Sequence, residues 1–158
     1  MQAQFDQALA MHQAGNLQQA EAAYRHILSV HPDQPVVNIK LATLLQQTQR
    51  NNEALNCYQL AIAKLPTEIA LILQASDLAS QVGDNVRAKQ WLAMVLRLEP
   101  NHLQANEQMA GVLVANHCEL ESLEYCKRAL KLNPKSANAY NLKGLAQCRL
   151  GDTEKGYK

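Results

Sequence analysis

Histidine and cysteine side chains are the residues in this sequence best suited to bind a metal or to act in catalysis. His117 and Cys118 are adjacent, and Cys126 follows eight residues later. No two cysteines have the Cys-x-x-Cys spacing of a zinc site, and four cysteines are too few for a secreted disulfide scaffold. We therefore predict no metal site, no cofactor and reduced, mostly buried thiols at Cys57, Cys118, Cys126 and Cys148.

Catalysis by a histidine needs a second group that orients the ring or receives its proton. His12 is the histidine best placed to face a binding groove, yet no carboxylate or nucleophile stands beside it at helical spacing. His117 falls where a tight turn is expected and is interpreted as a substitute for glycine. We predict that the chain is not an enzyme.

Composition limits the classes of partner. The 15 Lys and Arg residues and 14 Asp and Glu residues give a net charge of +1 at pH 7, which disfavours sequence-independent binding to nucleic acid or acidic lipid. No apolar run reaches the roughly 18 residues that span a bilayer, and the first residues lack a basic and apolar leader. We expect a cytoplasmic protein with no nucleic-acid or membrane partner.

The elements that must position these side chains follow a period of 34 residues. A proline ends a helix because it lacks an amide donor and clashes with the carbonyl four residues back. Four of the five prolines keep the period: Pro32, Pro66, Pro100 and Pro134. The predicted repeats are 1–34, 35–68, 69–102 and 103–136, followed by a partial repeat 137–158.

Each repeat has the pattern of two helices joined by a tight turn. Between the helices, Gly15, Gly83 and Gly151 precede Asn or Asp, which predicts a left-handed residue and then a helix cap. Small residues let the two helices cross closely, since a larger side chain there would cost about 1 to 3 kcal/mol. They recur at two positions of the repeat: the eighth (Ala8, Ala42, Ser76, Ala110, Gly144) and the twentieth (Ala20, Ala54, Ala88, Ser122, Gly156).

The starts of the first helices also carry signals. We expect Thr67, Asn101 and Ser136 to cap them and Pro35 to occupy a first helical position. One helix pair cannot bury its apolar face alone, so the repeats have to stack into a solenoid.

These columns resemble the tetratricopeptide repeat over nearly the whole chain. The resemblance also rests on Tyr24 and Tyr58 at position 24 and on Ala61 and Ala129 at position 27. It implies an all-α fold, a right-handed α-solenoid, forming a single array over residues 1–158. Departures occur at the turn glycine (Gln49, His117), at position 24 (Leu92, Cys126) and at position 27 (Ile27, Val95), where we expect local repacking.

The first repeat has a narrower resemblance. Residues 8–28 are similar to the opening repeat of bacterial arrays that precede a sulfotransferase or glycosyltransferase domain. The sequence stops at "GDTEKGYK", where a fifth second helix should begin, so we expect the parent chain to continue.

The resemblance implies that partners bind on the concave face, which the first helices line. The side chains of a first helix that face this groove are those at positions 5, 9 and 12 of the repeat and their neighbours. An apolar strip of Phe5, Leu9, Ile39 and Leu73 either receives an amphipathic or extended partner segment or fills the packing between neighbouring helices. The predicted groove residues are Phe5, Leu9, His12, Ile39, Lys40, Thr43, Gln46, Leu73, Gln74, Asp77, Ser80, Glu107 and Gln108.

Two known uses of the family need residues that are missing. The clamp for chaperone tails needs Lys, Asn and Arg at set positions, which here hold Phe5, Leu9, Lys40, Ala70 and Gln74. Sugar-transferring relatives use an asparagine at position 6 of successive repeats, where this chain has Asp6, Lys40, Gln74, Gln108 and Leu142. We exclude chaperone-tail binding and leave binding of a peptide backbone open.

Two functions remain. The first is an interaction scaffold that holds a protein or peptide partner in the groove, and the second is a substrate-recruiting module of a larger transferase. The last first helix would leave Tyr140, Leu145 and Ala146 partly uncovered, so self-association through the C-terminal end is a further expectation.

Overall fold

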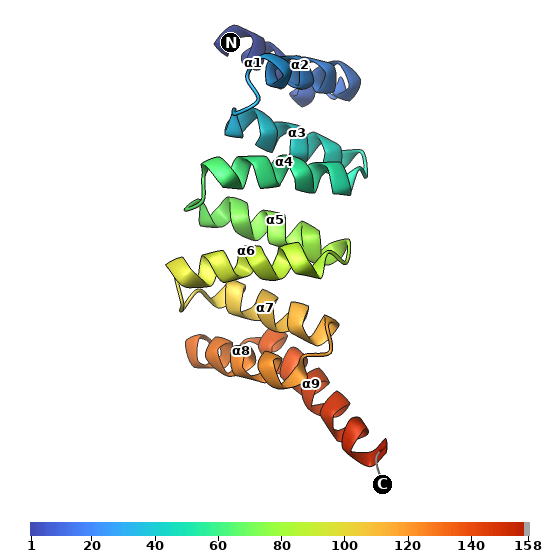
Figure 1. Ribbon diagram of the computed structural model, residues 1–158, viewed down its shortest axis with the longest axis vertical. Helices are drawn as coiled ribbons and strands as arrows, with labels where there is room; N and C mark the ends of the chain where they lie inside the picture. The colour runs from blue at the N-terminus through green and yellow to red at the C-terminus, as the bar shows by residue number, and fades with distance from the viewer. Residues whose placement is uncertain (157–158) are drawn as a thin grey trace. The chain divides into compact units, whose positions relative to one another are not determined.

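The computed structural model describes the backbone of residues 1–156 and the side chains of residues 1–151. In this part of the chain the regular elements are nine α-helices and no strand (Figure 1). They are α1 (Gln2–Gln13), α2 (Leu17–Val30), α3 (Pro35–Gln47), α4 (Asn51–Lys64), α5 (Ile69–Gln81), α6 (Asn85–Leu98), α7 (Leu103–Ala115), α8 (Glu119–Leu132) and α9 (Ala137–Gly156). This arrangement confirms the predicted all-α solenoid of helix-turn-helix repeats.

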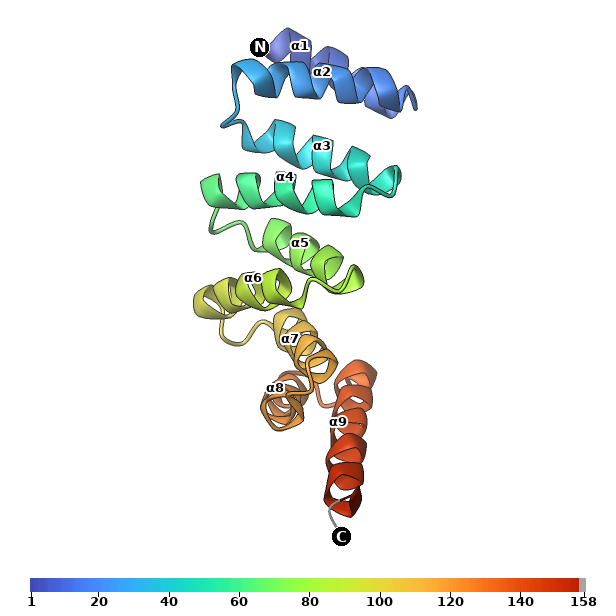
Figure 2. The ribbon, with the colours of Figure 1, turned by 45° about the vertical axis from the view of Figure 1, so that its right-hand side comes forward.

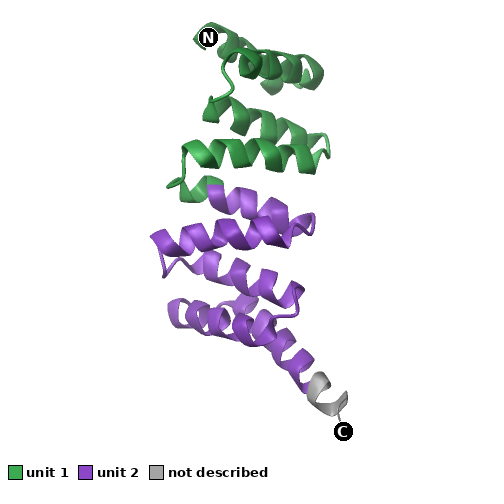
Figure 3. Ribbon diagram, viewed as in Figure 1, with its two compact units in different colours: residues 1–71 green, residues 72–158 purple. Residues whose placement is uncertain are grey.

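The chain divides into two compact units, Met1–Leu71 and Ile72–Lys158 (Figure 3). In the first unit α1 packs on α2, α2 on α3 and α3 on α4. In the second unit α6 packs on α7 and α7 on α8, and α9 contacts both α7 and α8 (Figure 2). None of the helices among the described residues is long and apolar enough to cross a membrane. The single array over residues 1–158 stays a prediction.

The two columns of small residues lie at the helix crossings, as predicted. In the first four repeats every residue of both columns is 0% exposed. Ser122 Oγ, in the second column, donates a hydrogen bond to the carbonyl oxygen of Ala110, in the first column, over 2.9 Å. The helices of this pair therefore approach to main-chain contact, which only a small side chain permits.

The turns inside the repeats confirm the expected left-handed residue. Gly15 and Gly83 both have φ near +80°, and the substitutes Gln49 and His117 have φ of 61° and 57°. Side chains with a Cβ adopt this region at a cost, so the packing of the two helices holds these two residues there. After the turn, Asp84 caps α6 by accepting from the amide of Arg87.

The fifth repeat differs from the prediction. α9 continues through Gly151 to Gly156, so the expected turn at Gly151 and a separate helix after it are wrong. A continuous helix keeps the main-chain hydrogen bonds that a turn at Gly151 would break. Gly144 is accordingly exposed, with no atom within 4 Å of an added Cβ. Gly156 lies outside the side chains described.

The uncovered end of the stack also needs one correction. Tyr140 and Leu145 are exposed, as expected, but Ala146 is fully buried because α9 packs against both α7 and α8. Arg149 Nη1 donates to the carbonyl oxygen of Val114 over 2.6 Å and so joins α9 to the last turn of α7. Self-association through this end stays a prediction.

The caps at the first helices are partly as predicted. Pro35 is the first residue of α3, and Ser136 Oγ accepts from the amide of Ala139 before α9. The cap of α7 is His102, whose Nδ1 accepts from an amide, and not Asn101. Thr67 lies two residues before α5 begins, so it does not adjoin that helix. The loops that follow Pro66 and Pro100 are thus one residue longer than the sequence suggested.

Two buried asparagines at position 4 of their repeats, which the sequence analysis missed, hold these loops. Asn38 Nδ2 donates to the carbonyl oxygens of Pro32 (3.3 Å) and Gln34 (3.1 Å). Asn106 Nδ2 donates in the same way to Pro100 (3.1 Å) and His102 (2.9 Å). Each amide satisfies two carbonyls next to the start of a first helix and fixes the path between repeats.

We predict that Asn38→Ala lowers the free energy of unfolding by about 1 to 3 kcal/mol, because two side-chain hydrogen bonds are lost: the carbonyl of Pro32 loses this donor, and that of Gln34 keeps only the main-chain amide of residue 38. Urea unfolding followed by circular dichroism measures the loss. The control is Asn52→Ala, which removes an exposed amide from the first turn of α4. An equal effect of the two substitutions would contradict a structural role for Asn38.

Candidate partner-binding surfaces

The predicted groove residues of the first unit lie on α1 and α3, two helices in contact. All of them are half-buried, so each combines packing with an exposed part. We call this set the α1–α3 surface: Phe5, Leu9, His12, Ile39, Lys40, Thr43 and Gln46.

Buried Tyr24 of α2 supports two members of this surface. The ring centroids of Phe5 and Tyr24 are 6.2 Å apart, and those of His12 and Tyr24 are 5.9 Å apart with the rings nearly perpendicular. Burial raises the pKa of Tyr24, so its hydroxyl keeps its proton. The contacts with Tyr24 therefore hold the Phe5 and His12 side chains in fixed positions and leave one part of each exposed.

Both ring nitrogens of His12 have a polar partner. Nδ1 is 3.4 Å from the hydroxyl oxygen of Tyr24, and Nε2 is 3.2 Å from Oε1 of Gln47. A neutral imidazole satisfies both when Nδ1 accepts from the tyrosine and Nε2 donates to the glutamine. Neither partner is a carboxylate or an activated nucleophile, so the arrangement joins α1, α2 and α3 rather than preparing the ring for proton transfer.

The predicted residues of the second unit lie on α5 and α7. Leu73 is only 6% exposed and offers almost no apolar surface. Gln74 and Asp77 are exposed, whereas Ser80, Glu107 and Gln108 are half-buried. We call the five polar residues the α5–α7 surface.

Hydrogen bonds between helices order part of the α5–α7 surface. Ser76 Oγ donates to Oε1 of Gln108 over 3.3 Å, which joins α5 to α7. Glu107 accepts from Ser136 Oγ and from Nδ2 of Asn138 (3.4 Å) at the start of α9. Asp77 accepts from Gln81 within its own helix. This surface is thus polar and acidic, in contrast to the mixed α1–α3 surface with its Lys40.

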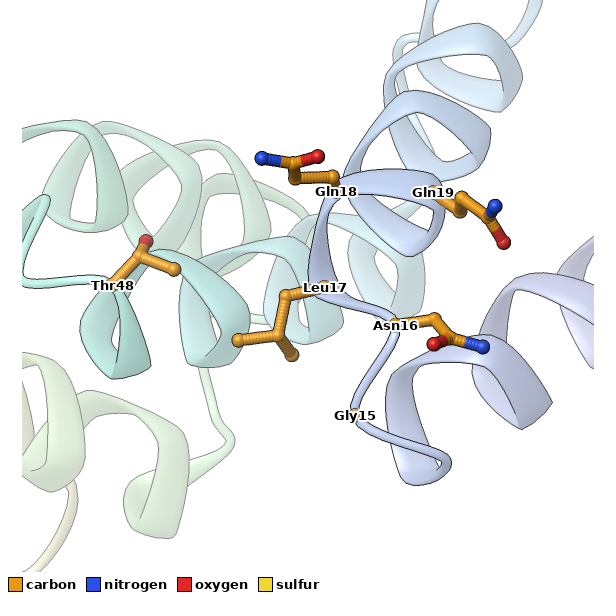
Figure 4. Close-up of a pocket in the computed structure, with 6 residues that line it drawn as sticks. All are labelled: Gly15, Asn16, Leu17, Gln18, Gln19 and Thr48. Atoms are coloured by element: carbon orange, nitrogen blue, oxygen red, sulfur yellow. The ribbon is translucent and has the colours of Figure 1, made fainter.

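Among the hollows that adjoin the first repeat, two lie at the ends of α1. One, of about 300 Å³, lies beside Phe5 between the start of α1 and the start of α3; it is lined by Met1, Gln2, Phe5, Gln34, Val36 and Val37. The other, of about 470 Å³, lies at the α1–α2 turn and is shown in Figure 4, where Leu17 points towards the helix end that carries Thr48; it is lined by Gly15, Asn16, Leu17, Gln18, Gln19 and Thr48. Only the first hollow includes a predicted groove residue.

Comparison with known proteins agrees with the helix pairs. Protein-family models described as tetratricopeptide repeat match residues 11–76 and 125–157, together more than half of the chain. The chain is built from tetratricopeptide repeats. A search of curated proteins found no match.

Solved structures of tetratricopeptide-repeat proteins have a similar fold. MamA has a TM-score of 0.80 and 17% identity, over 95% of this chain and 82% of that chain. A tetratricopeptide repeat protein from Parabacteroides merdae ATCC 43184 has a TM-score of 0.80 and 17% identity, over 97% of this chain and 61% of that chain. YrrB, described as a TPR protein with an unusual peptide-binding site, has a TM-score of 0.78 and 16% identity, over 96% and 78%. At these identities the similarity concerns the fold.

The repeats of the first unit share a bond that the sequence analysis missed. In each, the residue at position 12 contacts the hydroxyl of the buried tyrosine at position 24: His12 with Tyr24, and Gln46 Oε1 with Tyr58, whose hydroxyl donates over 2.7 Å. The next two repeats have Leu92 and Cys126 at position 24, both fully buried. The departure from tyrosine therefore removes a polar anchor of the first-helix surface rather than the packing.

No group of three or more His, Cys, Asp and Glu side chains among the described residues could hold a metal ion. His117 Nδ1 is 3.8 Å from Glu119 Oε1, and Cys118 bonds to the carbonyl oxygen of Asn116. Of the four cysteines only Cys126 is buried and Cys148 is exposed, so the expectation of mostly buried thiols is wrong. Burial raises the pKa of the Cys57 and Cys126 thiols, which keeps both protonated at neutral pH.

An ion-pair network between second helices also escaped sequence reasoning. Arg50 of α4 pairs with Glu21 of α2 (2.8 Å) and with Glu53 (2.8 Å), and Arg25 of α2 pairs with Glu21 (2.8 Å) and Glu53 (2.9 Å). The hydrogen bonds from Arg50 and then Arg25 lower the pKa of Glu53 to about 2. Partial burial acts to raise the pKa of Glu21, but the bonds from the two arginines outweigh it and the pKa is lowered.

We predict that this network weakens in acid. The pKa of Glu53 is lower in the folded state than its ordinary value of 4.5, so its contribution to stability is present above pH 4.5. That contribution is lost as the pH falls towards about 2. Urea unfolding at several pH values measures the free energy of unfolding. Between these two pH limits it should fall less for Glu53→Gln than for the wild type.

The control for this measurement is Glu68→Gln, which removes an exposed carboxylate without an ion pair among the described residues. Its acid profile should follow that of the wild type. Identical profiles for Glu53→Gln and Glu68→Gln would show that the network does not respond to protonation.

Proposed function

We propose that the chain is a non-catalytic scaffold that binds a segment of a protein partner on the α1–α3 surface. The observation that carries the proposal is the partial exposure of all seven residues of this surface. In the same repeats, the small residues at positions 8 and 20 are fully buried. The membership of the repeat family supports it, because first helices are the partner-binding helices of that family. The description of YrrB as having a peptide-binding site agrees with the same use.

The chemistry of the surface suits a segment that is partly apolar. Phe5, Leu9 and Ile39 supply apolar area, worth roughly 25 cal/mol for each Å² removed from water. Thr43 and Gln46 are oriented by hydrogen bonds to Ile39 and Tyr58, so they supply polar contacts in fixed positions. Contacts that are ordered before binding cost less conformational entropy on binding.

The second unit by itself offers a different chemistry. With Leu73 buried, α5 presents almost no apolar surface at this position. The polar and acidic α5–α7 surface, which includes Gln108 and Glu107, suits polar contacts rather than apolar side chains of a partner. The attached transferase domain that the first repeat resembles has no support among the matches, and we do not propose it.

Selection from a displayed library of random peptides tests this function, followed by fluorescence anisotropy with the selected peptides. We expect Ile39→Asp to weaken binding at least tenfold, because it places a charge on the apolar part of the surface. Lys40→Glu, which reverses a charge at a half-buried position of the surface, should change which peptides are selected.

The matched control is Leu60→Asp on α4, which introduces the same charge at an apolar side chain that is 57% exposed outside the surface. Circular dichroism confirms that each variant stays helical. Selected peptides that bind Ile39→Asp and the wild type equally, with the helical signal intact, would reject the α1–α3 surface.

A further inference from the structure

A hollow in the second unit lies outside the first-helix surfaces, where the C-terminal end of α8 meets the loop between α6 and α7. Its volume is about 330 Å³. Two cations, an amide and two apolar side chains surround it: Arg128, Lys131, Asn101, Pro100 and Leu132. We call it the α8 hollow.

Neither cation of the α8 hollow forms an ion pair in contact with a carboxylate among the described residues, although the charge of Arg128 helps, after Lys127, to lower the pKa of Glu124 on the same helix. The guanidinium of Arg128 lies over the ring of Tyr125, 5.0 Å from its centroid, which orients its donors without using them. On the same helix, the carboxylate of Glu124 is bonded to Lys127 over 2.7 Å. Both cations are exposed and so remain available to a partner.

The equivalent place in the first unit has different charges. There the loop after Pro32 carries Asp33, which pairs with Lys64 at the end of α4 over 3.0 Å. Two periods along the chain, Asn101 stands in place of Asp33 and Leu132 in place of Lys64, so both charges of that pair are replaced. The cations of the α8 hollow, Arg128 and Lys131, stand where the first unit has Leu60 and Ala63, and the loop beside them carries an amide and no acid.

We propose that the α8 hollow binds an acidic peptide segment of a protein partner, whose carboxylate pairs with the two exposed cations of the hollow. Arg128 and Lys131 pair with an Asp or Glu side chain of that segment, and Asn101 donates its amide to the same group. An apolar neighbour in the segment packs on Pro100 and the exposed part of Leu132. The ion pairs and the apolar contact together determine which peptide segments bind.

Charge distribution favours a peptide over a nucleic acid. Glu99 adjoins the hollow in sequence, and the whole chain has a net charge of +1. A phosphate backbone carries one charge every few ångströms and needs an extended row of cations. One pair of cations matches one or two carboxylates.

Fluorescence anisotropy with the full chain tests the site. The probe is a labelled, end-blocked peptide of alternating Glu and Leu, and the comparison peptide has Gln in place of Glu. We expect the Glu peptide to bind and the Gln peptide not to bind. The affinity for the Glu peptide should fall as the salt concentration is raised from 50 to 500 mM, because salt screens ion pairs at the surface.

Two variants separate the site from general charge. Arg128→Gln with Lys131→Gln should weaken binding at least tenfold, whereas Lys89→Gln with Lys127→Gln removes the same charge from the second unit outside the hollow and should change binding less than twofold. Asn101→Asp places a carboxylate on the loop that lines the hollow with Arg128 and Lys131, so it should abolish binding of the Glu peptide by supplying an internal carboxylate.

Three results would overturn the proposal. The first is equal binding of the Glu peptide by the wild type and by the variant lacking Arg128 and Lys131. The second is equal binding of the Gln and Glu peptides. The third is tighter binding of an oligothymidine probe or of vesicles containing phosphatidylserine than of the Glu peptide, which would make the cations a site for phosphate.

Discussion

The close crossing of two helices at a pair of small residues is the constraint on which the rest of each repeat depends. Ala8, Ala20 and their equivalents in the first four repeats are fully buried, and Ser122 reaches the main chain of Ala110. Helices at this distance leave room for only a tight turn, so the residue between them takes a left-handed conformation even when it is Gln49 or His117. The fifth repeat, where α9 continues as one helix, lacks this crossing among the described residues, and its small residue Gly144 lies exposed.

The crossing also determines which side chains reach the surface of the first helices. In the first unit, the buried Tyr24 and Tyr58 extend their hydroxyls to position 12, which orders His12 and Gln46. Leu92 and Cys126 replace these tyrosines in the second unit, and the ordering there comes instead from Gln108 and Glu107. A single repeat pattern thus provides a mixed apolar and polar surface in one unit and a polar, acidic surface in the other. Differences at buried positions change the exposed chemistry.

The ion pairs also differ between the two units, because equivalent positions of the repeat carry different residues. Asp33 and Lys64 form an ion pair between a loop and a second helix, and Glu21, Arg25, Arg50 and Glu53 join two second helices. Exposed pairs of this kind contribute little singly and more as a network. In the second unit Asn101 and Leu132 replace both members of the pair between Asp33 and Lys64, and cations at other positions of α8, Arg128 and Lys131, form the second proposed binding site.

The sequence by itself determined the period and, for the first four repeats, the helix pairs, the crossing columns and the turn residues. These features depend on side-chain size and spacing within about thirty residues, which a single sequence displays directly. Tertiary structure alone decided the burial of Leu73, the continuation of α9 through Gly151 and the loop bonds of Asn38 and Asn106. It also decided the pairing of charges 28 and 29 residues apart. The reason is physical: burial, helix ends and ion pairs depend on which atoms a neighbouring helix brings into contact, and the spacing of residues in one repeat does not specify those atoms.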